Sequence, residues 1–170
     1  MNIIFFAFLF FLPAGVANMV PVFAAKLFPK WDMALDFGLT FRGKSILGNH
    51  KTIRGLISGI FLGILFALFL SFLFPQLYQT KAIFIGFLLS FGALLGDSIK
   101  SFFKRQVGIA SGKSWFPFDQ IDYILGGMLF SLLAIRLSLL DYFTIFIVYF
   151  LLHLFVSWIG FLVGLKKAAL

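Results

Sequence analysis

Long apolar runs separated by short basic segments make up most of the chain. Residues 1–25, 55–80 and 142–165 are uncharged, and each run has the roughly 20 residues that a helix needs to cross a bilayer. Residues 82–96 and 123–135 form two shorter apolar runs that reach spanning length only if their acidic ends enter the membrane or its interface. The pattern predicts an all-α integral membrane protein with five transmembrane helices.

Three prolines and the loop lengths refine this prediction. Pro75 is expected to end the second helix near its far boundary, while Pro13 and Pro21 indicate that the first helix is kinked or broken. No polar segment exceeds about 30 residues, whereas a separate domain normally needs at least 50. Residues 1–170 are therefore predicted to form a single transmembrane domain.

The composition excludes several classes of protein. With 62% hydrophobic and 12% charged residues, the chain could not cover its apolar surface in water, which excludes a soluble globule. It contains no Cys, so disulfides, thiolate metal sites and cysteine nucleophiles are also excluded. Every acidic residue is an Asp, and the six are Asp32, Asp36, Asp97, Asp119, Asp122 and Asp141.

The net charge of +8 is distributed unevenly between the predicted loops. Twelve Lys and Arg residues fall on one side of the five helices, whereas only Lys81 and Arg136 fall on the other. Because basic residues gather in cytoplasmic loops, the N-terminus is predicted outside and the C-terminus in the cytoplasm. This placement also argues against nucleic acid as a partner. The twelve are Lys26, Lys30, Arg42, Lys44, Lys51, Arg54, Lys100, Lys104, Arg105, Lys113, Lys166 and Lys167.

Acidic and basic side chains cluster where the third predicted helix ends and the fourth begins. Asp119 and Asp122 share a face at the start of the fourth helix, where the helix dipole favours anions. Since consecutive helices run in opposite directions, Asp97 is expected at the same depth. If the third helix continues past residue 96, the spacing i, i+3, i+4, i+7 places four polar residues on one face: Asp97, Lys100, Ser101 and Lys104.

Two interpretations of this cluster remain open. Ionisable groups at membrane depth usually line a functional cavity, and oxygen ligands beside cations suit Mg²⁺ and a nucleotide triphosphate better than zinc. Alternatively, Asp119 caps the fourth helix, Asp122 pairs with Lys104 or Arg105, and the cluster only closes the bundle. His153 lies inside the fifth predicted helix, where an imidazole satisfied by another helix is the simpler interpretation.

The first loop, residues 37–55, combines glycines with basic side chains. Glycines permit a close backbone approach, and the basic groups offer charge to phosphates, with Thr52 as an added hydroxyl. The spacing of a Walker loop is not met. Contact with anionic lipid headgroups is an equally open interpretation. The residues concerned are Gly38, Gly43, Gly48, Gly55, Arg42, Lys44, Lys51 and Arg54.

At these residues the sequence resembles the CDP-archaeol synthase family, a relative of the phosphatidate cytidylyltransferases. Compared with the bacterial enzymes, Ser101-x-x-Lys-Arg is kept, the following Lys-Asp and His-Gly-Gly are absent, and Gln120 replaces an Arg, which favours the archaeal-lipid branch. Four stretches carry the match: Ala17-Asn-Met-Val-Pro21; Asp36-Phe-Gly with Arg42-Gly-Lys; Leu47-Gly-Asn-His-Lys-Thr-Ile-Arg-Gly55; and Gly96-Asp-Ser-x-x-Ser-Phe-x-Lys-Arg105 followed by Asp119-Gln-Ile-Asp122.

The resemblance implies a multi-pass cell-membrane enzyme whose active site faces the cytoplasm and binds CTP and a membrane lipid phosphate. It implies that Asp97, Asp119 and Asp122 hold Mg²⁺ and act in catalysis, together with Lys104 and Arg105 on the substrate phosphates. The CTP-binding residues that it implies are Gly48, Asn49, Lys51, Thr52 and Arg54. The lipid-phosphate-binding residues that it implies are Arg42, Lys44 and Ser101.

The resulting hypothesis is that a lipid phosphate attacks the α-phosphorus of CTP, which forms a CDP-activated lipid of the CDP-archaeol type and pyrophosphate. One alternative keeps this chemistry but uses phosphatidic acid and gives CDP-diacylglycerol. A small membrane transporter could also hold carboxylates and lysines within a bundle, although a polar cluster at one membrane face rather than at the midplane argues against it. A catalytically silent scaffold is a third alternative, which gives no reason for the polar cluster.

Overall fold

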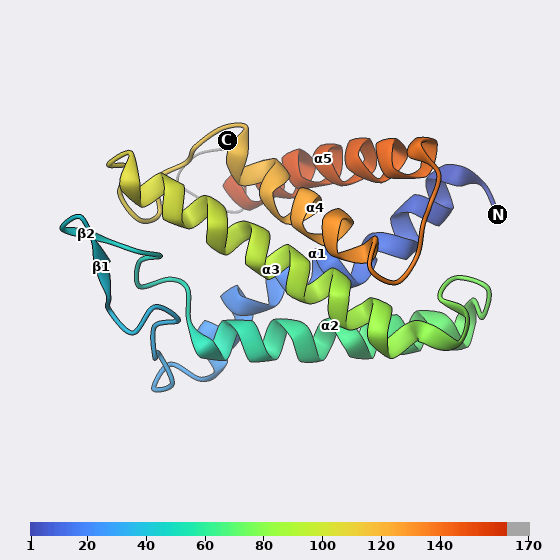
Figure 1. Ribbon diagram of the computed structural model, residues 1–170, viewed down its shortest axis with the longest axis horizontal. Helices are drawn as coiled ribbons and strands as arrows, with labels where there is room; N and C mark the ends of the chain where they lie inside the picture. The colour runs from blue at the N-terminus through green and yellow to red at the C-terminus, as the bar shows by residue number, and fades with distance from the viewer. Residues whose placement is uncertain (163–170) are drawn as a thin grey trace.

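The chain folds into a bundle of α-helices, seen in a computed structural model that describes residues 1–162 (Figure 1). A two-stranded antiparallel hairpin in the first loop and one short 3-10 turn, η1, complete it. In chain order the elements are α1 Ile3–Leu27, β1 Thr40–Phe41, β2 Lys44–Ser45, α2 Ile53–Leu73, η1 Gln79–Lys81, α3 Ala82–Gln106, α4 Phe118–Ser131 and α5 Leu139–Leu162.

Within residues 1–162, four helices are long and apolar enough to cross a membrane, namely α1, α2, α3 and α5. The fourth predicted helix begins with its acidic residues as expected, since α4 starts at Phe118, but it ends at Ser131, before the apolar run ends at residue 135. Its 14 residues span only about 21 Å at 1.5 Å per residue, against about 30 Å of hydrocarbon. The predicted cytoplasmic C-terminus, with Lys166 and Lys167, lies outside the described residues.

The loops gather at two ends of the bundle (Figure 1). The segments 28–52 and 107–117 lie at one end, and the N-terminus lies at the other with the segments 74–81 and 132–138. Helix α3 contacts α1, α2 and α4. The basic loops of the described chain therefore share one end, as their sequence pattern predicts.

Helix α1 is continuous through both of its prolines, so of the two predicted outcomes, a kink or a break, the break does not occur. Pro13 has no N–H to donate to the carbonyl of Leu9 four residues earlier. The buried hydroxyl of Tyr78 donates to that carbonyl at 3.1 Å and to the carbonyl of Phe10 at 2.9 Å. A side chain outside α1 thus satisfies the group that the proline leaves free, while α2 ends at Leu73, before Pro75, as predicted.

Glycines allow α3 and α4 to cross in backbone contact. A Cβ atom at Gly96 would lie 2.3 Å from the carbonyl oxygen of Asp122, and one at Gly126 would lie 2.2 Å from that of Gly92. Real Cβ atoms essentially never approach so closely, so no larger residue fits without moving a helix. This crossing places the residue after Gly96, which is Asp97, beside the first turns of α4.

Candidate active site

Three carboxylates from two helices converge on the ammonium group of Lys100. Its Nζ lies 3.2 Å from Oδ1 of Asp97, 2.6 Å from Oδ1 of Asp119 and 3.0 Å from Oδ2 of Asp122. Asp97 and Lys100 share a face because α3 continues to Gln106, as the spacing predicts. The convergence of the three aspartates is confirmed, with Lys100 at its centre.

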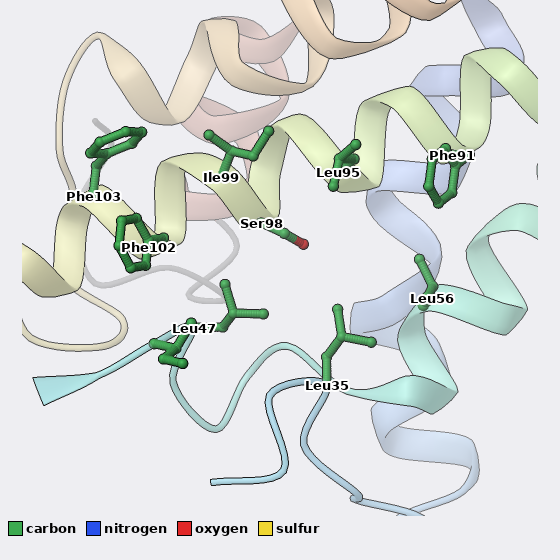
Figure 2. A pocket seen from close by; sticks show the side chains of 10 residues that line it. Leu35, Leu47, Leu56, Phe91, Leu95, Ser98, Ile99, Phe102 and Phe103 are labelled. Atoms are coloured by element: carbon green, nitrogen blue, oxygen red, sulfur yellow. The ribbon is translucent and has the colours of Figure 1, made fainter. Parts of the chain in front are cut away.

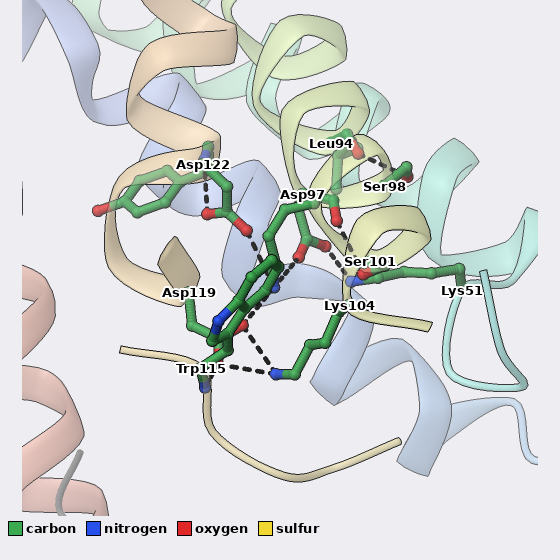
Figure 3. Close-up of polar contacts among 11 residues, drawn as sticks. Lys51, Leu94, Asp97, Ser98, Ser101, Lys104, Trp115, Asp119 and Asp122 are labelled. Carbon is green, nitrogen blue, oxygen red and sulfur yellow. Dashed lines mark hydrogen bonds and ion pairs between the residues drawn. The ribbon is translucent and has the colours of Figure 1, made fainter. Parts of the chain in front are cut away.

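Two more lysines complete this cluster (Figure 3). Lys51, from the first loop, reaches across to Oδ2 of Asp97. Lys104, buried on α3, donates to both carboxylate oxygens of Asp119 at 2.9 and 2.8 Å. The six-residue cluster therefore balances three carboxylates against three ammonium groups, and it consists of Lys51, Asp97, Lys100, Lys104, Asp119 and Asp122.

The alternative interpretation, in which the acidic residues only cap the fourth helix and close the bundle, predicts contacts that differ from those in the structure. Pro117 is the N-cap residue of α4 and no side chain caps that helix, so Asp119 is not the cap. Instead, Asp119 accepts a hydrogen bond of 2.6 Å from the backbone N–H of Trp115. Asp122 pairs with Lys100, not with Lys104 or Arg105.

Both carboxylate oxygens of Asp122 have partners in this cluster. Its Oδ1 accepts from the backbone N–H of Tyr123 at 2.6 Å. Its buried Oδ2 forms an ion pair with the ammonium group of Lys100 at 3.0 Å, and no N–H or O–H group of residues 1–162 donates to it in regular hydrogen-bond geometry. A buried carboxylate oxygen whose partner is an ammonium group is suited to a cation.

The donor set fits Mg²⁺ in kind, since carboxylate oxygens are the ligands that this ion prefers. Among residues 1–162, however, no three acidic or histidine side chains are already arranged to hold a metal ion. Lys100 explains this, because its ammonium group lies between the carboxylates. These residues therefore fit the ion on condition that Lys100 withdraws.

Asp36 organises the loop that carries Lys51. Its carboxylate accepts backbone hydrogen bonds from Gly38 at 3.0 Å, Leu47 at 2.8 Å and Gly48 at 3.4 Å. Partial burial by itself would raise the pKa of Asp36, but these three N–H groups hold that pKa below its ordinary value. The sequence assigned Asp36 no role beyond its motif, although an Asp two residues before a Gly is a recognised turn signal.

The residues predicted to bind CTP are only partly brought together. Lys51 joins the carboxylate cluster, and Gly48 lies beside it along the loop with φ at +85°, a conformation that glycine adopts readily. A Cβ atom at Gly48 would lie 3.7 Å from Cδ of Arg105, whose buried Nε has no hydrogen-bond partner. Asn49 is exposed.

Thr52 and Arg54 have structural contacts instead. The hydroxyl oxygen of Thr52 caps α2 by accepting from the N–H of Gly55 at 3.2 Å. Arg54 is buried and donates to the carbonyl oxygen of Phe28, just past the end of α1. These contacts join the first loop to α1 and α2.

The residues predicted to bind the lipid phosphate lie apart from one another. Arg42 is exposed in the hairpin turn and stacks on the ring of Phe41 at 5.3 Å. Lys44 donates to the carbonyl oxygen of Gln106 at the end of α3. Ser101 donates to the carbonyl oxygen of Asp97 at 2.8 Å, within α3.

The ring of His153 lies against α4. Its ring centroid is 5.6 Å from that of Tyr123. It takes no part in the carboxylate cluster.

Comparison with known proteins gives a consistent result over most of the chain. A family model described as CarS-like CDP-archaeol synthase matches residues 1–170. The CDP-archaeol synthase of Methanospirillum hungatei is 39% identical over 150 residues, 79% of this chain and 88% of the relative. That of Pyrobaculum aerophilum is 34% identical over 162 residues, 94% of each chain. A solved structure described as "Structural insight into an intramembrane enzyme for archaeal membrane lipids biosynthesis" has a TM-score of 0.79 at 29% identity, covering 89% of this chain and 92% of that chain.

Proposed function

The chain belongs to the CDP-archaeol synthase family, whose reaction is CTP-dependent transfer of a cytidylyl group to an archaeal lipid phosphate, and we propose that the carboxylate and lysine cluster is where this chain performs it. The observation that carries this proposal is the convergence of Asp97, Asp119 and Asp122 from two helices on one ammonium group. The cluster contacts both basic loops, because Lys51 of segment 28–52 pairs with Asp97 and Trp115 of segment 107–117 donates its backbone N–H to Asp119. The convergence of these carboxylates gives no comparable support to a membrane transporter or to a catalytically silent scaffold.

In the reaction, an oxygen of the lipid phosphate forms a bond to the α-phosphorus of CTP. The bond from that phosphorus to the oxygen bridging to the β-phosphate breaks, and pyrophosphate leaves. Because a phosphate monoester has a second pKa near 6, the nucleophile is already largely ionised at neutral pH and needs no strong general base. The task of the protein is therefore to align anions and offset their repulsion.

We assign that task chiefly to the lysines. Lys51, Lys100 and Lys104 enter the cluster from a loop and from two turns of α3, so they surround one small volume. Their ammonium groups can bind phosphate oxygens on different sides of the reacting phosphorus. Arg105, beside Gly48, is placed to contact the far end of the triphosphate.

Asp97, Asp119 and Asp122 would hold the Mg²⁺ ion. When bound, the ion supplies positive charge to phosphate oxygens as charge moves toward the pyrophosphate. The Oδ2 atom of Asp122 supports this assignment, because it is buried and its partner is already a cation, the ammonium group of Lys100.

We propose that the chain crosses the membrane five times, with α4 as the short fourth crossing and the cluster facing the cytoplasm. Support comes from the opposite directions of α3 and α4 in Figure 1 and from the positive-inside rule. Since the chain has no Cys, Asn49→Cys and Arg136→Cys provide single labelling sites. A membrane-impermeant thiol reagent should label Cys at 49 only from the cytoplasmic side and Cys at 136 only from outside.

The function is tested with purified protein in lipid nanodiscs, CTP labelled at its α-phosphorus and a panel of ether and ester lipid phosphates. The label should appear in the lipid in equal amount to the released pyrophosphate, with the isoprenoid ether acceptor preferred over phosphatidic acid. Label that stays out of every lipid refutes the proposed function. Equal or better use of phosphatidic acid supports CDP-diacylglycerol synthesis instead.

A further inference from the structure

An apolar groove of about 400 Å³, the α2–α3 groove, lies between α3, the first turn of α2 and the first loop (Figure 2). Leu95 and Phe102 line it from α3, Leu56 from α2, and Leu35 and Leu47 from the first loop. This groove lies outside the carboxylate cluster, and the transfer reaction described above makes no use of it.

The chemistry of the groove suits hydrocarbon rather than a headgroup. Its exposed lining is apolar. Ser98 is the polar residue among those lining it, and its hydroxyl already donates to the carbonyl of Leu94 at 2.7 Å. A polar ligand would therefore lose hydrogen bonds to water without replacement, whereas an alkyl chain loses nothing.

The length of the groove matches one leaflet of a membrane. Along α3 it extends from Phe91 to Phe103, which is about 18 Å at 1.5 Å per residue. This is close to half of the roughly 30 Å hydrocarbon thickness of a bilayer. Asp97 of the cluster lies within this span, so a chain of a lipid whose phosphate is at the cluster can follow the groove toward Phe91 and continue into the bilayer.

The groove adjoins the cluster directly. Ser98 in the groove follows Asp97 in the cluster, so the two sites occupy neighbouring faces of α3. Leu35, in the groove wall, donates its backbone N–H to the carbonyl of Lys51 at 2.7 Å, and the ammonium group of Lys51 contacts Asp97. The same loop thus borders the groove on one side and supplies a phosphate-binding cation on the other.

We propose that the α2–α3 groove binds one isoprenoid chain of the lipid phosphate acceptor and sets the chain preference of the enzyme. This inference rests on the proposed function. A basic cluster that continues into an apolar groove fits a ligand with an anionic head and an apolar tail. Because lipid tails are as apolar as leucine, the groove selects by shape and orientation rather than by hydrophobic transfer.

The test fills the groove from both walls with Leu95→Trp and, separately, Leu56→Trp. Leu151→Trp is the matched control, since Leu151 is exposed on α5. Each variant is assayed in nanodiscs with two acceptors that share the same phosphate headgroup, one with two C20 isoprenoid chains and one with short chains. Both groove variants should lower kcat/KM about tenfold for the C20 acceptor, the size of a steric misfit in an apolar pocket. The kcat/KM for the short-chain acceptor and the KM for CTP should be unchanged.

The outcomes separate this inference from the proposed function. Wild-type values on both acceptors in both groove variants, or an equal loss on long and short chains, overturn the groove assignment. The same tenfold loss of kcat/KM for the C20 acceptor in Leu151→Trp also overturns it, because a substitution on α5, outside the groove, then has the same effect. If the wild-type protein transfers no label to any acceptor, it is the proposed function that fails.

Discussion

Lys100→Met removes the ammonium group that contacts all three carboxylates of the cluster. The variant leaves three carboxylates facing two lysines and vacates the space between them. In the wild-type protein, a divalent cation entering this space must first displace Lys100. That displacement breaks the hydrogen bond of 2.6 Å from Lys100 to Asp119.

The expected change in cation affinity follows from the free energy of that hydrogen bond. A hydrogen bond to a charged group contributes about 1.5–3 kcal/mol, and every ~1.4 kcal/mol changes a binding constant tenfold. We therefore expect Lys100→Met to bind a divalent cation about 10- to 100-fold more tightly than the wild-type protein when no nucleotide is present.

Electron paramagnetic resonance titration of nucleotide-free protein with Mn²⁺, as a probe for Mg²⁺, measures this affinity directly. Lys81→Met is the control, because it makes the same change of charge at the opposite end of the bundle. Equal or weaker Mn²⁺ binding in Lys100→Met refutes the idea that Lys100 occupies the cation position. If Lys81→Met gains as much Mn²⁺ affinity as Lys100→Met, the effect comes from net charge alone.

Three further variants test the scaffold around the cluster. Gly126→Ala should lower the free energy of unfolding by about 1–3 kcal/mol, because its Cβ meets the carbonyl of Gly92, and an unchanged thermal midpoint in detergent contradicts this. Tyr78→Phe leaves the carbonyl of Leu9, which Pro13 cannot serve, without a donor and should cost about 1–3 kcal/mol, measured in the same way. The folded pKa of Asp36 is below its unfolded value, so its ionised form stabilises the loop above about pH 4, and this stability is lost as the pH falls through the lower, folded value. Hydrogen exchange at Leu47, corrected for intrinsic rate, should rise at that acid pH in the wild-type protein and be high at every pH in Asp36→Ala, which has no side-chain acceptor.

The convergence of the three aspartates could be predicted from sequence because it depends on local rules. Helical spacing places Asp97 with Lys100, and the reversal between consecutive helices brings Asp119 and Asp122 to the same end. The glycines of α3 and α4 then fix the contact.

The remaining features depend on contacts that sequence spacing does not encode. Lys51 reaches Asp97 from 46 positions away, and that contact requires the loop shape that Asp36 imposes. The end of α4 at Ser131 could not be predicted, because an apolar run that continues to residue 135 predicts burial but not whether its last residues are helical. The structural roles of Thr52 and Arg54 depend on where α1 ends relative to α2.

Asp122→Asn provides the most direct test of the cluster as the catalytic site. The substitution is nearly isosteric, and the amide oxygen can keep the hydrogen bond from the N–H of Tyr123, so the fold should survive. We predict that pyrophosphate release from CTP with the isoprenoid lipid phosphate falls at least about 100-fold, while Asp141→Asn at the other end of the bundle stays near wild type. A folded Asp122→Asn protein that releases pyrophosphate at the wild-type rate contradicts the account.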